Sequence, residues 1–267
     1  MLTLQNISKT FNPGTVNEKK ALTGLNLHLD EGDFVTILGS NGAGKSTLFN
    51  AIAGSFTVDS GSILLDGRNI TNLPDYKRSK FIGRLFQDPL RGTAPNMTIE
   101  ENLALAFMRA SAATSPFSMI SRKDRENFRE RLAMLDLGLE DRMSHPVGLL
   151  SGGQRQALTL LMATLVTPKL LLLDEHTAAL DPATAEKVLN LTKQIVHDHN
   201  ITCLMITHNI PSALELGNKT IMMNDGNIVL ELSGETRRSL STQALLDLFR
   251  AHASRGLETD RILFSAE

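Results

Sequence analysis

The chain has 267 residues, of which 42% are hydrophobic and 21% charged, as expected of a globular protein that can bury a sizeable core. Its formal net charge of −2 excludes recruitment of nucleic acid or anionic lipid by bulk electrostatics, so any phosphate must be bound at a local site. No apolar run reaches the ~20 residues that cross a bilayer. The single cysteine, Cys203, excludes an intrachain disulfide.

The N-terminal part is predicted to be rich in β-strands. Leucines alternate with polar residues over 25–29, which is typical of a half-buried strand. Residues 34–38 form a compact apolar run, which is typical of a strand buried on both faces. Residues 63–65 predict another strand, and the Asp66-Gly67 pair after it predicts a hairpin turn.

The middle of the chain, from about 97 to 167, has a largely helical pattern. Phe128, Leu132 and Leu135 recur at helical spacing among charged residues. The Ser-, Ala- and Pro-rich run over 110–121 predicts a loop between helices.

Strands return after Pro168. Short apolar runs over 170–173 and 202–206 flank a helix-like stretch over 183–196, and this alternation predicts a parallel sheet with crossover helices. A hairpin over 222–230 and an amphipathic helix over 241–253 are expected to follow. The sequence therefore predicts a helical subdomain inserted into an α/β core.

Residues 39–46, GSNGAGKS, match the P-loop pattern G-x-x-x-x-G-K-[ST] between a predicted strand and a predicted helix. Glycines let consecutive N–H groups turn toward phosphate, and the helix N-terminus adds its positive dipole end. We expect Lys45 to reach the β- and γ-phosphates, Ser46 to bind Mg²⁺ and Thr47 to support the α-phosphate. The predicted nucleotide contacts of this loop are Gly39, Ser40, Asn41, Gly42, Ala43, Gly44, Lys45, Ser46 and Thr47. The alternative is a chance glycine-rich turn, which the strand–loop–helix context disfavours.

An apolar strand over 170–173 ends in two carboxylates, Asp174 and Glu175. Asp174 is expected to hold Mg²⁺ at the carboxyl end of the strand, and Glu175 to polarise an attacking water. The alternative is a strand that is followed by an ordinary polar turn.

Residues 150–156, LSGGQRQ, precede a predicted helix. Ser151 and Gln154 form a capping box in sequence, which is a complete structural explanation of both. Gly152 and Gly153 are costly in a first helical turn unless something approaches the backbone closely, and a phosphate is the obvious candidate.

The LSGGQ run, after a P-loop and before an Asp-Glu strand end, resembles the signature of ABC ATPases. That resemblance covers residues 2 to about 232 and implies a RecA-like P-loop NTPase core, an antiparallel β subdomain and a helical subdomain at about 89–167. Residues 233–267 are then a helical extension of the same domain. The family would also assign roles to Gln87 as the Q-loop residue that binds Mg²⁺, Asp181 in the D-loop, His208 as the switch residue at the γ-phosphate, and Phe11 as the ring that stacks on adenine.

The resemblance implies a Mg²⁺-dependent ATPase that works as a head-to-tail homodimer with two sandwiched ATP molecules. Ser151, Gly152, Gly153 and Gln154 of one copy would meet the nucleotide on the Lys45 loop of the other. The implied partners are a transmembrane permease at the cytoplasmic face of the membrane and, indirectly, a binding lipoprotein. The stretches 84–97 and 174–181 resemble importer ATPases for small solutes such as aromatic amino acids. His176 departs from the family because many members have proline there, which leaves the turn less rigid.

Three alternatives stay open on the sequence. An ABC exporter ATPase would share the same motifs. A soluble ABC protein that acts on ribosomes or DNA usually has two cassettes or a long coiled-coil insert, and no nucleic acid partner is expected here. A P-loop kinase or GTPase is disfavoured by the LSGGQ run.

Overall fold

The computed structural model describes residues 1–110 and 120–252, which fall into two compact units. The first unit combines Met1–Arg78 with the chain from Thr202 onward, and the second is Ser79–Ile201. The loop expected over 110–121 lies largely outside the described residues. The helical subdomain expected at 89–167 falls within the second unit, and its boundaries and those of the C-terminal extension stay predictions.

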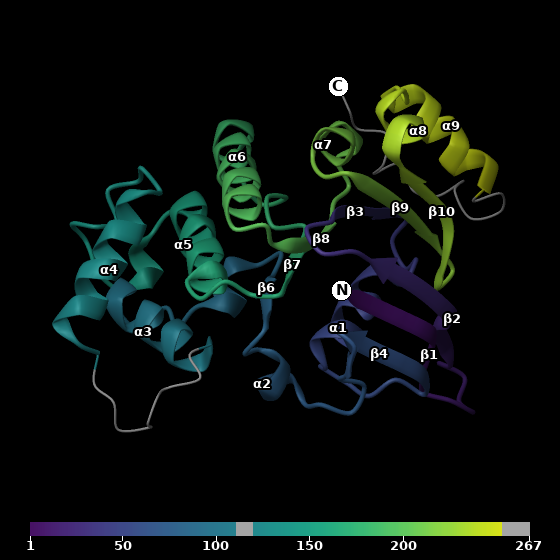
Figure 1. Cartoon of the computed structure of the whole chain (residues 1–267), viewed down its shortest axis with the longest axis horizontal. Coiled ribbons are helices and arrows are strands. Elements are labelled where there is room, and N and C mark those ends of the chain that lie inside the picture. Colours follow the sequence, from purple (N-terminus) through teal and green to yellow (C-terminus); the bar gives the residue numbers. More distant parts are fainter. Residues whose placement is uncertain (111–119, 253–267) are drawn as a thin grey trace. The chain divides into compact units, whose positions relative to one another are not determined.

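The first unit contains an antiparallel sheet in the order β2-β1-β4-β5 (Figure 1). Its strands are β1 Leu2–Phe11, β2 Lys19–Leu29, β4 Ser60–Leu65 and β5 Arg68–Asn69. The predicted alternation is confirmed, since Leu25, Leu27 and Leu29 are buried while Asn26 and His28 are exposed. The Asp66-Gly67 turn is also confirmed, because both residues have the positive φ of a tight hairpin, 49° and 72°.

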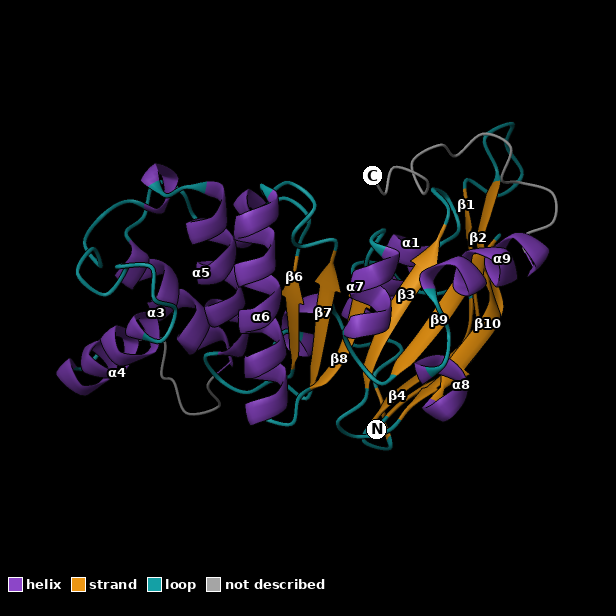
Figure 2. Cartoon of the chain, turned by 90° about the horizontal axis from the view of Figure 1, so that it is seen from above, coloured by secondary structure: helices purple, strands orange, loops and turns teal. Residues whose placement is uncertain are grey.

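A second set of strands in the first unit carries the P-loop. The strands β3 Phe34–Gly39, β8 Thr202–Ile206 and β9 Lys219–Asn224 are parallel, and β10 Asn227–Ser233 pairs antiparallel with β9 (Figure 2). All residues of β3 and β8 are buried, as the apolar runs predict. The helices of this unit are α1 Lys45–Ala53, α2 Asp75–Arg78, α7 Ile210–Glu215, α8 Gly234–Arg238 and α9 Thr242–His252.

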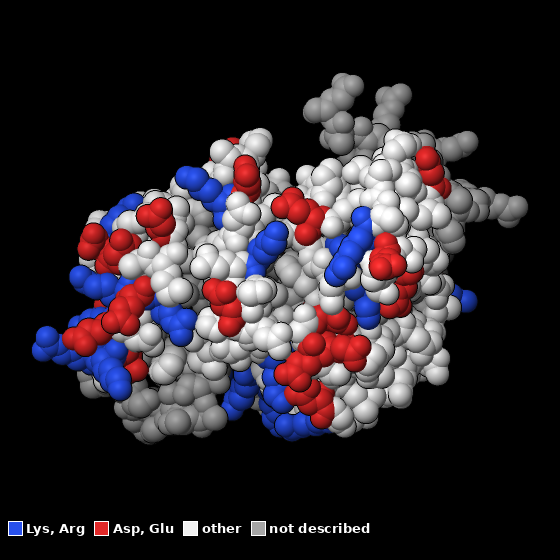
Figure 3. Space-filling view, turned by 45° about the horizontal axis from the view of Figure 1, so that its top comes forward, with Lys and Arg blue, Asp and Glu red and all other residues white. Residues whose placement is uncertain are grey.

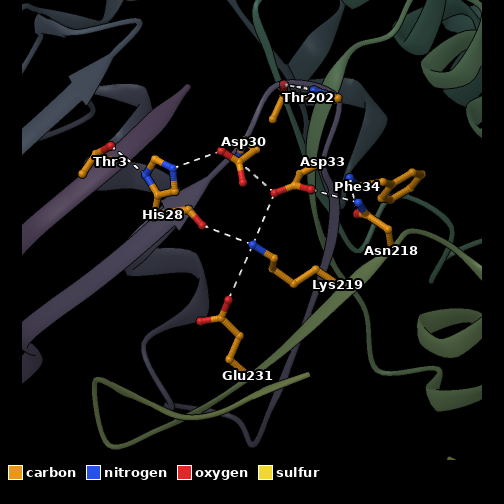
Figure 4. A network of polar contacts seen from close by, with 10 residues as sticks. Thr3, His28, Asp30, Asp33, Phe34, Thr202, Asn218, Lys219 and Glu231 are labelled. Carbon is orange, nitrogen blue, oxygen red and sulfur yellow. Dashed lines mark hydrogen bonds and ion pairs between the residues drawn. The ribbon is translucent and has the colours of Figure 1, made fainter. Parts of the chain in front are cut away.

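A polar network fixes the start of β3 (Figure 4). The Asp33 carboxylate accepts hydrogen bonds from the Asp30 N–H and the Asn218 side chain, both at 2.9 Å, and pairs with Lys219 at 3.3 Å. Burial alone would raise the pKa of Asp33, but the bond from Asn218, the other hydrogen bonds and the Lys219 charge together lower it. The carboxylate thus stays ionised and joins the end of β2 to the start of β9.

Within its described residues, the second unit pairs β6 Ile82–Leu85 in parallel with β7 Leu170–Asp174, and its other named elements are helices. Its helices are η1 Pro89–Gly92, α3 Ile99–Ala110, α4 Arg122–Ala133, η2 Val147–Leu149, α5 Gly152–Thr164 and α6 Pro182–Asp198. The predicted stripe of Phe128, Leu132 and Leu135 is buried in one core with α3 and α5. The helical character expected of this part of the chain is confirmed.

Arg78 holds the C-terminal end of α1, the helix that follows the P-loop. Its guanidinium is buried and donates to the carbonyls of Ala51 and Ile52 at 2.8 and 2.7 Å, and to those of Leu73 and Thr71. These carbonyls include the last ones of α1, which have no partner within the helix. A buried arginine therefore terminates α1 and joins it to the loop before α2.

Arg78→Leu is expected to lower the free energy of unfolding by about 3 kcal/mol, because several buried carbonyls lose their donors. Urea unfolding followed by circular dichroism measures the change. Arg68→Leu, at an exposed position in β5, is the matched control and should change stability by less than ~0.5 kcal/mol. Equal effects of the two variants would contradict the role given to Arg78.

Candidate functional site

The P-loop joins the end of β3 to the start of α1 as a tight backbone cradle. A Cβ on Gly39 would lie 2.5 Å from the Met223 carbonyl oxygen. Gly44 has a φ of 102°, and a Cβ there would lie 2.7 Å from the Ala21 carbonyl oxygen. Side chains at these two positions would therefore push the loop away from the strands that support it.

Lys45 is the first residue of α1 and is only 6% exposed. Its ammonium donates to the carbonyl oxygens of Gly39 at 2.6 Å and Ser40 at 3.0 Å. The positive charge thus lies over the loop, beside a helix N-terminus whose cap, Gly44, has no side chain with which to accept a hydrogen bond. This arrangement fits a phosphate group, which would accept hydrogen bonds from Lys45 and from the first-turn N–H groups.

Two neighbouring segments hold the loop in place. The Gly226 N–H of the β9–β10 hairpin donates to the Ala43 carbonyl at 3.0 Å, and the Gly226 carbonyl accepts from the Thr23 N–H of β2 at 3.2 Å. The hairpin over 222–230 was predicted from the sequence, but its contact with the P-loop was not. No local signal relates residues that lie so far apart in the sequence.

His208 lies in the first unit, directly after Thr207 at the carboxyl end of β8. Because β3 and β8 are parallel, with Ile37 opposite Ile206, the P-loop and His208 leave the sheet at the same edge. The Thr207 N–H donates to the Ile37 carbonyl at 3.3 Å, and Asn209 caps α7 by accepting from the Ser212 N–H at 2.8 Å. The switch position is therefore anchored to the strand that carries the P-loop.

Phe11 ends β1 and is partly buried. Its ring packs against Phe56 in a T-shaped arrangement with centroids 5.4 Å apart, and the Lys9 ammonium lies 5.7 Å from the Phe11 ring centroid. Lys9 also pairs with Asp59 at 2.7 Å, and this hydrogen bond lowers the pKa of Asp59. Sequence reasoning singled out Phe11 but missed Phe56 and Lys9, which support its ring.

Asp174 ends β7 in the second unit, and Glu175 follows with a φ of 45°. Parallel pairing of Leu85 with Leu173 brings the ends of β6 and β7 to one edge, so Gln87 and the two carboxylates leave the strands on the same side. Gln87 is exposed, whereas Asp174 and Glu175 are partly buried.

Arg84 of β6 is the charged neighbour of Asp174 that the sequence reading missed. Burial lowers the pKa of Arg84, and the Asp174 carboxylate acts in the opposite direction. The guanidinium lies over the Phe86 ring at 4.5 Å from its centroid. Arg84 could have been identified from the sequence as a basic residue within an otherwise apolar strand.

The capping box at the start of α5 is confirmed. Ser151 Oγ accepts from the Gln154 N–H, and Gln154 Oε1 accepts from the Ser151 N–H, both at 3.2 Å. Gly153 has an internal reason to be glycine, since a Cβ there would overlap the Thr184 side chain of α6. Gly152 is exposed and has only an ordinary contact near it. The predicted close approach of a phosphate therefore stays a prediction for Gly152 and is not needed to explain Gly153.

Asp181 is the N-cap of α6. Its carboxylate is exposed and accepts from the Thr184 N–H at 3.0 Å, and the hydrogen bonds from Thr184 lower its pKa. The D-loop position thus has a structural role within the chain, and its contact with a nucleotide stays a prediction.

The family described as "ABC transporter" matches residues 22–178, more than half of the chain. The chain belongs to this family. It is 43% identical over 250 residues to the "Tyrosine transport ATP-binding protein" of Clostridioides difficile (strain R20291), covering 93% of this chain and 98% of that protein. It is 33% identical to the "Phosphonates import ATP-binding protein PhnC" of Lactococcus lactis subsp. lactis (strain IL1403), covering 86% of this chain and 92% of that one.

Solved structures give the same result. The dimeric post-hydrolysis state of an ATP-binding cassette bound to ADP and phosphate has a TM-score of 0.75 at 32% identity, covering 87% of this chain and 98% of that one. A nucleotide-free ATP-binding cassette has a TM-score of 0.74 at 28% identity, covering 96% and 99%. The expected family and the expected P-loop NTPase fold are therefore confirmed.

This chain is thus an ATP-binding, ATP-hydrolysing ABC protein. The alternative of a P-loop kinase or GTPase is excluded by this family assignment. Within the two described stretches of the chain, no helix combines the length and apolar character needed to cross a membrane.

Proposed function

We propose that this chain drives import of an aromatic amino acid, tyrosine or a close analogue, through a separate transmembrane permease. The observation that carries this proposal is the 43% identity to a tyrosine transport ATP-binding protein over nearly the full length of both chains. The phosphonate import ATPase named above is 33% identical, ten percentage points less, and its substrate is chemically unrelated to tyrosine. In this proposal a binding lipoprotein delivers the solute, and the chain works at the cytoplasmic face of the membrane.

Uptake of labelled tyrosine tests the substrate. Cells that lack this chain are expected to lose high-affinity tyrosine uptake, and the wild-type chain restores it. Lys45→Met supplied in the same way should not restore it. Unchanged tyrosine uptake in the deletion strain, with loss of phosphonate uptake instead, would assign another substrate. Tyrosine efflux in place of uptake would favour the exporter.

In this proposal each residue has the role that the family resemblance implies. Lys45 and the P-loop N–H groups hold the phosphates, Phe11 stacks on the adenine and His208 donates a hydrogen bond to the γ-phosphate. Glu175 accepts the proton of the attacking water. The predicted Mg²⁺ ligands Ser46, Gln87 and Asp174 offer hydroxyl, amide and carboxylate oxygens, which are the donors that Mg²⁺ prefers. When bound, this ion neutralises charge that develops on the phosphoryl oxygens.

A second copy of the chain completes each nucleotide site in this proposal. Ser151 and Gly152 are exposed at the N-terminus of α5, a position that suits an anion supplied from outside the chain. The dimeric solved cassette supports a pair of equivalent chains. On the face drawn in Figure 3, acidic and basic side chains are intermixed, which offers nucleic acid no continuous basic surface there.

Phe11→Ala is expected to weaken ATP binding by about 10-fold, because base–aromatic stacking contributes ~1–3 kcal/mol. Fluorescence titration with a labelled ATP analogue measures the affinity. Phe11→Trp keeps an aromatic face and should retain the affinity within about 2-fold. Equal weakening by both variants would indicate that the ring packs against Phe56 and does not bind adenine.

A further inference from the structure

His176, the residue in place of the family's common proline, is buried between the Asp-Glu end of β7 and helix α6. It is 3% exposed, and its Nε2 lies 3.1 Å from the Thr192 hydroxyl, which is fully buried on α6. The Thr192 hydroxyl donates its proton to the Val188 carbonyl at 2.8 Å. A hydroxyl has one proton to donate, so the imidazole must be the donor and carries its hydrogen on Nε2.

The backbone next to His176 is in a conformation that needs support. Glu175 has a φ of 45°, in the left-handed region that side chains other than glycine rarely adopt. Such a residue persists only where its surroundings leave it no alternative. On one side Glu175 follows β7, whose first four residues are fully buried, and on the other its carbonyl accepts from the Ala178 N–H at 3.0 Å. The Leu180 N–H donates to the Thr177 carbonyl at 3.1 Å, and the buried side chain of His176 restrains the turn further.

We infer that His176 is a positioning residue for ATP hydrolysis: by donating to Thr192 it fixes the turn after β7 and thereby aims the Glu175 carboxylate. A proline at this position would restrict the backbone through its ring, whereas histidine restricts the same turn through a side-chain hydrogen bond to α6. This inference rests on the proposed role of Glu175 as the base. His176 itself contacts no substrate atom in this account.

The His176 ring acts as a hydrogen-bond donor to a single buried hydroxyl of α6. Removal of the Thr192 hydroxyl tests this hydrogen bond without changing the turn itself.

Thr192→Val removes the acceptor and keeps the side-chain shape. It is expected to lower kcat for ATP hydrolysis by about 10-fold while KM for ATP changes by less than about 2-fold, because a misplaced base affects chemistry more than binding. Thr192→Ser keeps the hydroxyl and should retain kcat within about 2-fold of wild type.

Thr164→Val is the matched control. Thr164 is also a buried helical threonine of the second unit, and its hydroxyl donates to the Leu160 carbonyl at 2.8 Å. This variant loses the same kind of helical hydroxyl bond but has no histidine partner, so its kcat should stay near the wild-type value. An equal fall of kcat in Thr164→Val and Thr192→Val would overturn the inference, as would a failure of Thr192→Ser to retain kcat.

A second measurement separates this inference from the proposed role of Glu175. In a Glu175→Gln background, Thr192→Val should cause no further loss, because the base that it misplaces is already absent. An additional ~10-fold loss in that background would overturn the positioning role and leave the role of Glu175 intact. Near-normal hydrolysis by Glu175→Gln alone would contradict both the positioning role of His176 and the role of Glu175 as the base.

Discussion

Replacement of Glu175 by glutamine is expected to slow ATP hydrolysis by about 10³-fold while ATP affinity stays within a few-fold of wild type. Glutamine has the shape of glutamate but cannot accept a proton from water. The backbone at this position, with its φ of 45°, is equally strained with either side chain, so the turn itself should not change. Phosphate release under saturating ATP measures the rate, and equilibrium titration measures the affinity.

The same variant should accumulate as an ATP-bound dimer, because hydrolysis is the step that releases the pair in the proposed mechanism. Size-exclusion chromatography with ATP and Mg²⁺ should show a dimer that wild type does not retain. Glu186→Gln, at an exposed position of α6, is the control and should behave as wild type. Near-normal hydrolysis by Glu175→Gln would contradict the assignment of Glu175 as the general base.

Turn chemistry and buried apolar runs made much of the fold predictable. Asp66-Gly67 and Asp225-Gly226 have the positive φ values that their hairpins require, and only a few residue types tolerate them. The run over 34–38 is buried throughout, as expected of a strand covered on both faces. These signals are local, so they can be seen in one sequence.

The burial of polar side chains could not be predicted from the sequence. Arg78 and Arg237 are both buried and donate to backbone carbonyls far along the chain, as Arg237 does to Ala213 at 2.7 Å. Arginine is mostly exposed in proteins, so composition and periodicity place it at the surface. Only the tertiary structure shows which carbonyls need such a donor.

The candidate site was predictable where its chemistry is carried by one continuous motif. The capping box of Ser151 and Gln154 and the start of α1 at Lys45 follow from neighbouring residues, and the structure has both. The packing of Gly153 against Thr184 joins residues that are distant in the sequence, and it supplies a reason for one of the two glycines that a phosphate had been invoked to explain.

Lys45→Met is expected to weaken ATP binding by about 100-fold or more, because a largely buried charge partner of the phosphates is lost. The Lys45 ammonium donates to the carbonyls of Gly39 and Ser40, which place its charge over the P-loop. Methionine fills a similar volume but offers no donor, so phosphate oxygens would face an apolar side chain.

Ligand-induced stabilisation measures this loss directly. At an ATP concentration of ~100 times the wild-type Kd, the wild-type chain should gain about 2.7 kcal/mol in stability, whereas a 100-fold weaker variant gains only about 0.4 kcal/mol. Lys77→Met, at an exposed position of α2 in the same unit, should keep the full gain. If Lys45→Met also kept it, the phosphates would be held by the loop N–H groups and the helix N-terminus, and the charge of Lys45 would contribute to hydrolysis alone.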